Sequence, residues 1–597
     1  MSDLTKFKQR LGIDRLVLQI HDVSFPSEPD EDVGRGSPYS RGAERFYAFA
    51  ARLGFDTIQL GPQGMTQRGN SSPYDGTLFS RNPMNLPLAR LVDEGRLSRE
   101  MFETIRIDPS SPRPPHSLIY DHFQRATSEI VAHADADDRD VAREFLAENE
   151  AWLVPDALYG ALCVEHNAPW WGMWDQTAQG TFDQRLYHPA RGDEAAATKR
   201  LADLRAQYAG YIEDYALIQW LLQREHDALR ERLKSFPLAI FADLQVGLSP
   251  QEMWARQSLF LDSYRMGAPP SRTNPAGQPW GYPVLDPQQL GTTEAPGSAL
   301  CFVQHRLQTV IDNYDGLRID HPHGWVDPWV YKTDDLEPFH AVQHGARLFS
   351  SPDEADHPQL ASFAIARTDQ IDTTQPRHGD HRVQALDESQ VARYALLVET
   401  IVTRSQALGR TTDAIACEVL STLPYPIRRV MERCGLGRFR VAQKANLDDP
   451  ADVYRIENAR PEDWIMLGTH DTATIWELAQ TWCGTPAGER WGQYLLPLID
   501  ENPGGRAALE KRIAESPGEL IHALFTAMLS SRARHVAIFF PDLFGMTERY
   551  NQPGVIADEN WSLRLPADFE QKYADRCRSG ESLDVARCLE QACQHSA

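Results

Sequence analysis

The sequence predicts a (β/α)8 barrel because of three features. Eight short apolar segments are spread along the chain, and polar residues that indicate a loop follow each of them. Amphipathic segments with helical periodicity lie between several of them. Charged side chains gather where the apolar segments end. Alternating strands and helices, with polar groups at the carboxyl ends of the strands, are typical of a parallel barrel whose active site lies at that end.

The eight apolar segments have the length and the flanking turn residues of buried strands in a parallel sheet. Such strands are apolar on both faces because helices cover the outside of the barrel and side chains fill its inside. The predicted strands span residues 15–22, 55–62, 237–246, 313–320, 413–420, 438–445, 464–471 and 534–542.

Three intervening segments predict helices: 40–54, 215–236 and 387–409. Each places apolar residues at positions i, i+3, i+4 and i+7, which form one face of a helix. The segment 387–409 also begins with acidic residues, which the positive end of the helix dipole favours. Residues 572–597 indicate one or two further helices, so we expect no separate C-terminal β-domain.

The distances between predicted strands indicate large insertions in a single catalytic unit, residues 1–597. We expect a helical insertion at 75–212, a substrate loop at 247–300 and an extra polar, proline-containing insertion at 332–386. Insertions in barrel enzymes usually follow strands, on the face that holds the active site. The insertion at 332–386 is either a lid or acceptor-side wall, or a surface loop without a role in catalysis.

Composition excludes several classes of partner. The chain of 597 residues is 42% hydrophobic and carries a net charge of −24 without a basic stripe. Nucleic acid or an anionic membrane would need clustered Lys and Arg, so neither is expected as a partner. No run of 18 apolar residues indicates a membrane span.

The first twenty residues contain no apolar signal core, and the eight cysteines are scattered without CxxC spacing. We therefore expect free thiols in a reducing cytoplasm and no zinc site.

Charged side chains stand at the ends of four predicted strands. Four carboxylates that meet at one barrel mouth with an arginine and a histidine would be costly to bury without a function. Such a set suits retaining glycoside chemistry, in which one carboxylate attacks the anomeric carbon and a second, protonated one serves the leaving oxygen. An arginine two residues before the nucleophile would lie on the same strand face and keep it ionised. These residues are Asp243, Arg318, Asp320, Glu418, His470 and Asp471.

Several motifs follow one another along the chain. They are HDVSFP (21–26), IQLGPQGMTQRGNSSPYDGTLFSRNP (58–83), FADLQV (241–246), GAPPSRTNPAGQPWGYP (267–283), LRIDH (317–321), CEVL (417–420), LGTHDTAT (467–474) and DLFGMTERYNQPG with NWSLRLP (542–566). In these motifs and their order the sequence resembles glycoside hydrolase family 77, the amylomaltases or 4-α-glucanotransferases, over almost its whole length.

The resemblance implies roles for nine motif residues and a reaction that needs no cofactor and no metal. Maltooligosaccharides or other α-glucans would be both donor and acceptor. It implies Asp320 as nucleophile, Glu418 as acid/base, Asp471 as transition-state stabiliser, and Tyr74, Asp243, Trp280, Arg318, His470 and Asn551 as substrate-binding residues. Aromatic residues on the substrate loop, Trp280, Tyr264 and Tyr282, would stack an acceptor sugar, exclude water and favour transfer over hydrolysis.

The sequence departs from the family pattern beside the catalytic residues. Pro322 and His323 stand where Phe and Arg are usual, Thr472 and Ala473 replace Asn and Asp, and Tyr282 replaces Asn. Two alternatives therefore remain beside a 4-α-glucanotransferase. One is an α-glucan hydrolase or a linkage-rearranging enzyme similar to the maltooligosyl trehalose synthases. The other is a non-catalytic glucan-binding protein.

Overall fold

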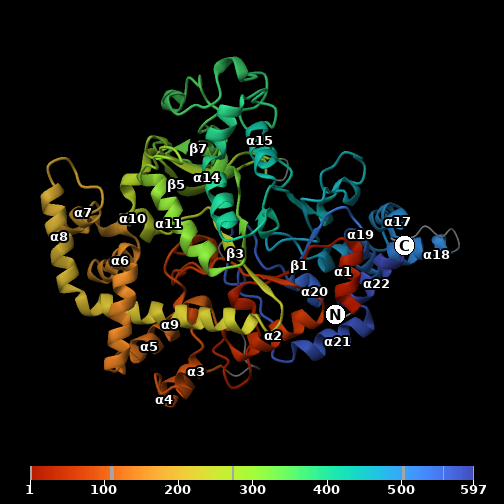
Figure 1. Ribbon diagram of the computed structural model, residues 1–597, viewed down its shortest axis with the longest axis horizontal. Coiled ribbons are helices and arrows are strands. Elements are labelled where there is room, and N and C mark those ends of the chain that lie inside the picture. Colours follow the sequence, from red (N-terminus) through yellow and green to blue (C-terminus); the bar gives the residue numbers. More distant parts are fainter. Residues whose placement is uncertain (1–2, 108–112, 272–273, 500–504, 556, 596–597) are drawn as a thin grey trace.

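Eight parallel strands form the centre of the protein. The structure is a computed structural model and describes residues 3–107, 113–271, 274–499, 505–555 and 557–595 (Figure 1). The strands are hydrogen-bonded in the order β10-β11-β12-β1-β2-β3-β6-β9, and each lies inside one of the eight predicted segments. The predicted (β/α)8 barrel is thereby confirmed. The strands are β1 (Arg15–Gln19), β2 (Thr57–Gln59), β3 (Ala239–Leu244), β6 (Gly316–Ile319), β9 (Ile415–Cys417), β10 (Phe439–Val441), β11 (Trp464–Met466) and β12 (His535–Phe539).

Side chains that alternate along these strands fill the inside of the barrel. Val17, Phe241, Ala416, Val441 and Met466 belong to one buried cluster, which is separate from the main core outside the strands. The same alternation sets the direction of the side chains at the strand ends. A residue two positions after Phe241 or Ala416 points to the same inner face, because successive strand residues alternate between faces.

The barrel is surrounded by helices that include all three predicted ones. The Ser40 side chain accepts a hydrogen bond from the Ala43 N–H at the start of α2, and Asp387 forms a capping box at the start of α14. Near the chain ends α22 packs against α1, where the Cys593 thiol contacts the Phe7 carbonyl. These helices are α1 (Asp3–Leu11), α2 (Arg41–Arg52), α9 (Ala209–Leu233), α10 (Pro250–Ala255), α11 (Ser298–Asn313), α12 (His323–Val326), α14 (Glu388–Ala407), α15 (Tyr425–Cys434), α16 (Ile475–Trp482), α17 (Pro486–Ile499), α18 (Arg506–Glu515), α19 (Pro517–Leu529), α20 (Phe540–Phe544), α21 (Phe569–Ser579) and α22 (Val585–His595).

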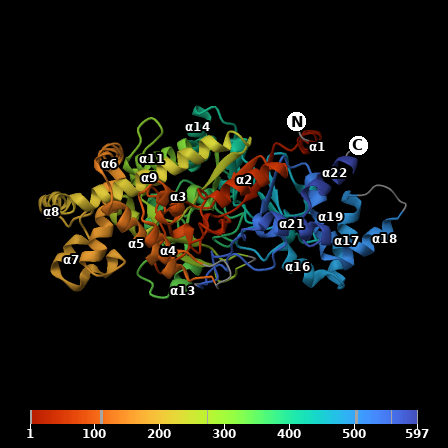
Figure 2. The same cartoon turned by 90° about the horizontal axis from the view of Figure 1, so that it is seen from below.

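The segment predicted as a helical insertion, 75–212, is helical over most of its described length; residues 108–112 lie outside the described part. Its longest helix, α6, packs along α9 (Figure 1). Figure 2 shows that α6, α7 and α8 extend to the side of the barrel opposite α17 and α18. The helices of the insertion are α3 (Leu88–Asp93), α4 (Arg99–Ile105), α5 (His116–Ala132), α6 (Ala136–Glu165), α7 (Ala178–Asp183) and α8 (Glu194–Gln207).

The segments predicted as two separate insertions, 247–300 and 332–386, both contribute to one antiparallel sheet. Its order is β5-β4-β7-β8, and its third strand already begins at Trp329. Residues 272–273 of the substrate loop lie outside the described part. From residue 348 to 386 the chain forms loops and short 3-10 turns above the barrel, in the green segment at the top of Figure 1. The elements are β4 (Phe260–Ala268), β5 (Gln278–Leu285), β7 (Trp329–Lys332), α13 (Pro338–Gln343) and β8 (Ala346–Arg347).

No helix in the described part of the chain has both the length and the hydropathy needed to cross a membrane.

Candidate active site

Arg318 lies at the centre of a charged layer on the inner face of three adjacent strands, β3, β6 and β9. One of its terminal nitrogens, Nη1, donates to both carboxylate oxygens of Asp243, at 2.6 and 2.5 Å. The other, Nη2, donates to Glu418 Oε2 at 2.5 Å and to Asp320 Oδ1 at 3.2 Å. Asp243 and Arg318 are register partners in the sheet, which explains why their side chains meet. One buried guanidinium thus holds all three carboxylates of this layer.

Asp320, the first residue after β6, is held as an anion. Its Oδ2 accepts a hydrogen bond from the Val246 N–H at 3.1 Å, and its Oδ1 lies 3.3 Å from His321 Nδ1. Burial alone would raise the pKa of Asp320, but the charges of Arg318 and His321 hold it below its ordinary value. An ionised carboxylate at this position can act as a nucleophile.

Glu418, which follows β9, has the opposite electrostatic character. Burial raises the pKa of Glu418 above its ordinary value, and the charges of Arg318 and His321 offset only part of this effect. Its Oε2 receives the Arg318 hydrogen bond, whereas Oε1 makes no hydrogen bond within the described residues. Oε1 is therefore the oxygen that is free to carry a proton.

His321 was not among the predicted site residues, although it belongs to the LRIDH motif. Its Nδ1 lies 3.3 Å from Asp320 Oδ1 and 3.5 Å from Glu418 Oε2. Burial would lower the pKa of His321, but these two carboxylates raise it to about 9. Its backbone φ of 42° lies in the left-handed region, so the chain turns sharply directly after the nucleophile. His321 therefore supplies a second positive charge beside Asp320 and Glu418.

Asp471 lies on the other side of the barrel mouth, after β11. Its Oδ1 accepts a hydrogen bond from the Asn551 amide at 2.6 Å, and its Oδ2 lies 3.4 Å from His470 Nε2. Burial opposes ionisation of Asp471, but His470 and Asn551 hold its pKa below the ordinary value. The Asp471 side chain is 37% exposed and faces the cleft, where an ionised group can stabilise a developing positive charge.

Tyr74 connects the two halves of the site. Its hydroxyl donates to Asp243 Oδ2 at 2.8 Å and accepts from Arg318 Nη1 at 3.1 Å. Its ring stacks on His470, with ring centroids 5.0 Å apart and an interplanar angle of 22°. Tyr74 thus contacts Asp243 and Arg318 through its hydroxyl and His470 through its ring.

A cleft of about 790 Å³ opens over these residues. Of the nine predicted residues, six line it: Tyr74, Trp280, Asp320, His470, Asp471 and Asn551. The other three, Asp243, Arg318 and Glu418, lie behind this lining in the charged layer and are less than 9% exposed. All nine predicted residues are therefore brought together at the carboxyl ends of the strands.

The substrate loop contributes two of its three predicted aromatic residues to the cleft. Trp280 packs edge-to-face on His321 with centroids 4.9 Å apart. The Tyr282 hydroxyl donates to Asp75 Oδ1 at 2.7 Å across the cleft. Tyr264 does not line the cleft: it is buried, and its hydroxyl lies 3.3 Å from His357 Nδ1. Its expected contact with a sugar is therefore wrong, because the Tyr264 hydroxyl faces the buried His357 and not the cleft.

Sequence reasoning also missed an aromatic pair in the cleft region. His21 and Trp561 stack with centroids 5.7 Å apart and an interplanar angle of 5°. Trp561 lines the cleft, whereas His21 is buried behind Tyr74 and His470. Both residues lie in motifs of the family resemblance, HDVSFP and NWSLRLP, and this position was the only sequence signal for them.

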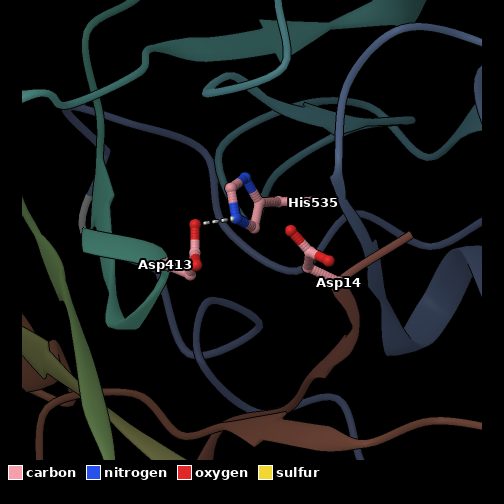
Figure 3. Close-up of side chains that lie close together, drawn as sticks. All are labelled: Asp14, Asp413 and His535. Atoms are coloured by element: carbon pink, nitrogen blue, oxygen red, sulfur yellow. Dashed lines mark hydrogen bonds and ion pairs between the residues drawn. The ribbon is translucent and has the colours of Figure 1, made fainter. Parts of the chain in front are cut away.

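Three groups of histidine and carboxylate side chains in the described part of the chain are close enough to be considered as metal sites. In each group the possible ligand atoms lie within 4.8 Å of one another. Each group also contacts an arginine, which offsets part of the carboxylate charge. In Figure 3 the His535 ring points to Asp413, and Asp14 lies beside them; Arg534 contacts both acids. Arg200 and Arg318 serve the other two groups in the same way. These arrangements are ion-pair networks. The groups are Asp14, Asp413 and His535; Glu165, His166 and Asp183; and Asp320, His321 and Glu418.

Comparison with known proteins shows the family of the chain. A family model described as 4-alpha-glucanotransferase matches residues 20–569. A 4-alpha-glucanotransferase of Thermus thermophilus is 26% identical over 52% of this chain and 59% of its own length. A chloroplastic or amyloplastic 4-alpha-glucanotransferase of Solanum tuberosum is 22% identical over 93% of this chain and 82% of its own length.

Two solved structures share the fold. An amylomaltase of Streptococcus agalactiae in complex with acarbose has a TM-score of 0.69 and 18% identity, and the match covers 94% of this chain and 97% of that one. An amylomaltase of Corynebacterium glutamicum has a TM-score of 0.62 and 16% identity, over 100% of this chain and 76% of that one. The family model covers most of the chain, and the chain therefore belongs to glycoside hydrolase family 77, the 4-alpha-glucanotransferase family.

Proposed function

We propose that the protein is a retaining 4-α-glucanotransferase that moves α-1,4-glucan segments between maltooligosaccharides. The observation that carries this proposal is the geometry of Asp320 and Glu418. Their carboxylate oxygens lie within 4.8 Å of each other, and burial raises the pKa of Glu418 while Arg318 and His321 hold the pKa of Asp320 low. Retaining glycosidases keep their two carboxyl groups about 5–5.5 Å apart, whereas inverting enzymes need about 6.5–9.5 Å to fit a water molecule.

The first step would form a covalent glycosyl-aspartate. The protonated Glu418 Oε1 gives its proton to the glycosidic oxygen, and an Asp320 oxygen attacks the anomeric carbon from the opposite face. The bond from the anomeric carbon to the leaving oxygen breaks, and the reducing-end fragment departs as an alcohol. Glu418 is then a carboxylate beside Arg318 and His321, whose charges stabilise it.

The second step would reverse these roles. The Glu418 carboxylate accepts a proton from the 4-hydroxyl of an acceptor glucan as that oxygen attacks the anomeric carbon. The ester bond to Asp320 breaks, and the nucleophile is regenerated. Two inversions at one carbon give net retention of the α configuration.

The remaining residues would stabilise the sugar between these steps. Asp471, ionised and facing the cleft, offsets the positive charge of the oxocarbenium-like transition state. Tyr74 offers an aromatic surface to the sugar, and its hydrogen bonds to Asp243 and Arg318 fix the ring. Trp280 and Tyr282 would cover the intermediate and hold the acceptor, so that a sugar hydroxyl reaches it before water.

Incubation of the pure protein with maltotriose tests this proposal. Transfer yields glucose together with maltotetraose, maltopentaose and longer products, which chromatography resolves by chain length. Glucose and maltose alone would identify an α-glucan hydrolase instead. No reaction with maltotriose or longer maltooligosaccharides would contradict both enzyme functions.

The pH dependence of kcat/KM offers a second test, since the two carboxyl groups must be in opposite protonation states. Activity should fall on the acid side below the ordinary range of an aspartate, because Arg318 and His321 lower the pKa of Asp320. It should fall on the alkaline side as Glu418 loses its proton. The positive charge of His321 lowers the pKa of both groups, so its removal should raise both.

His321→Asn is the suitable variant, because asparagine tolerates the left-handed backbone of this position. We expect both limbs of its kcat/KM profile to move to higher pH by up to about one unit relative to the wild type. A profile that stays in place or moves to lower pH would contradict the electrostatic role of His321.

A further inference from the structure

The segment that follows Glu418 has no regular secondary structure, although it begins at the proposed acid/base. Residues 418–424 connect β9 to α15 and form neither helix nor strand. At its start the Glu418 N–H donates to the Ile319 carbonyl at 3.1 Å, and the Val419 carbonyl accepts from Phe439 N–H at 3.2 Å. After Leu420, other parts of the chain must hold this acid/base loop (residues 418–424) in place.

One anchor comes from the insertion at 332–386. Asp380 Oδ2 accepts a hydrogen bond from the Leu423 N–H at 3.0 Å. The Asp380 carbonyl accepts a second bond from the Tyr425 N–H at 3.1 Å. Asp380 therefore holds the end of the acid/base loop with both its side chain and its backbone.

The part of the insertion that carries Asp380 is itself tightly bonded. Ile371 and Val383 form an isolated antiparallel bridge, and Arg382 donates to the carbonyls of Asp372 and Gln375 at 2.9 Å. Arg382 also pairs with Glu354 at 2.7 Å. These bonds fix the position of Asp380 relative to the rest of the insertion.

The charge of Asp380 has two partners at longer range. Its other oxygen, Oδ1, is buried and makes no hydrogen bond among the described residues. Arg347 and Arg438, both buried, have side-chain N–H groups that are likewise without a partner in the described structure. Burial lowers the pKa of both arginines, and the Asp380 charge offsets part of that effect. The Asp380 carboxylate thus has two buried arginines as charge partners beside its hydrogen bond to the acid/base loop.

A second anchor comes from the segment of the nucleophile. His323 Nε2 lies 3.2 Å from the Thr422 carbonyl, so this nitrogen carries the hydrogen and donates it. Burial and the Arg347 charge lower the pKa of His323 to about 3, which keeps the ring neutral. His323 begins α12, only three residues after Asp320. The bond therefore connects the segment of Asp320 directly to the acid/base loop.

We propose that Asp380 and His323 are positioning residues for Glu418, which they hold at the spacing from Asp320 that double displacement requires. This inference rests on the proposed function, in which Glu418 is the acid/base. It assigns the insertion at 332–386 a role in the chemical step that is neither a lid nor an acceptor-side wall. It also gives a purpose to His323, one of the residues at which the sequence departs from the family pattern.

The test compares two donors that differ in their need for acid catalysis. Maltotriose has a sugar leaving group that must be protonated, whereas α-maltosyl fluoride releases fluoride with little acid assistance. A displaced Glu418 should slow the first donor far more than the second. For Asp380→Ala we expect kcat on maltotriose to fall about 10- to 100-fold, because a shift of about 1 Å in a catalytic group can cost about 100-fold. The initial burst of fluoride release should change by less than about threefold.

Matched variants separate positioning from a general structural effect. Asp380→Asn keeps one oxygen that can accept from Leu423 and should restore part of the activity on maltotriose. His323→Leu should lose more activity on maltotriose than on α-maltosyl fluoride, as Asp380→Ala does. His323→Gln keeps an N–H group that can donate a hydrogen bond, so its loss of activity on maltotriose should be smaller. Asp372→Ala removes the partly exposed side chain of a turn aspartate in the same insertion, which bonds to Thr374 and Gln384, but it keeps the backbone carbonyl that accepts from Arg382. This variant should match the wild type on both donors.

Each outcome has one meaning. If Asp380→Ala loses activity equally on both donors, or keeps full activity on both, the positioning role is wrong while the proposed function stands. If the wild type transfers from neither maltotriose nor α-maltosyl fluoride, the proposed function itself fails and this inference fails with it.

Discussion

Asp320→Asn is expected to lower kcat on maltotriose by at least about 10⁴-fold, because the amide cannot form the covalent ester. The side chains have the same shape, so the cleft should keep its form. Activity should be lost with both donors, since the attack on the anomeric carbon is the same for maltotriose and for α-maltosyl fluoride. Initial rates of glucose and fluoride release measure the two losses directly.

The control for this variant is a buried aspartate outside the site. Burial and the neighbouring Glu252 hold the pKa of Asp156 well above its ordinary value, so asparagine resembles its neutral form. Asp156→Asn should keep activity within about threefold of the wild type, and circular dichroism of both variants should match. Near-normal turnover by Asp320→Asn with either donor would rule out Asp320 as the nucleophile.

Glu418→Gln is expected to lower kcat on maltotriose by about 10²- to 10⁴-fold, the usual contribution of a general acid/base. The loss should depend on the leaving group. The first step with α-maltosyl fluoride should proceed, but the second should stall because no base activates the acceptor. Azide needs no base, so its addition should speed the second step and yield α-maltosyl azide, which mass spectrometry identifies.

Glu252→Gln is the matched control, because Glu252 is buried, its pKa is raised by burial, and it lies outside the cleft lining. It should need no azide. If azide leaves Glu418→Gln unchanged and fluoride release is lost as fully as transfer, then Glu418 does not act as the acid/base.

The sequence predicted the barrel because its strands carry strong, repeated signals. Each strand is short, largely buried and mostly apolar, and inward-facing residues continue in register into the charged layer on β3 and β9, as Phe241 does into Asp243. The predicted strands were longer than the observed ones. Residues 313–315, for example, lie at the end of α11 and in the turn before β6. Apolar character continues past the point where hydrogen bonding to the neighbouring strand begins or ends, so periodicity cannot fix such boundaries.

The antiparallel sheet was not predicted. β4 pairs with β7 about 65 residues later in the chain, as in the register pair Tyr264 and Lys332. A single sequence does not show which distant strands pair, because pairing depends on the tertiary packing around them. For the same reason Tyr264 was expected at the cleft although it faces His357.

The residues of the charged layer could be predicted from the sequence, but their contacts could not. Asp243, Arg318 and Glu418 stand at the ends of predicted strands, which places them at the same edge of the sheet. That Arg318 contacts all three neighbouring carboxylates depends on the register between β3 and β6 and on side-chain geometry. The contribution of His321 depends on its left-handed backbone conformation, which the sequence does not predict for a histidine.

Trapping the glycosyl-enzyme tests double displacement at Asp320 most directly. Glu418→Gln protein is mixed with α-maltosyl fluoride, quenched in acid, digested and analysed by peptide mass spectrometry. We predict a maltosyl group on Asp320, in a peptide that contains LRIDH, and no such label in the Asp320→Asn, Glu418→Gln double variant. Fluoride release without any labelled peptide, or a label on another carboxylate, would contradict a double displacement at Asp320.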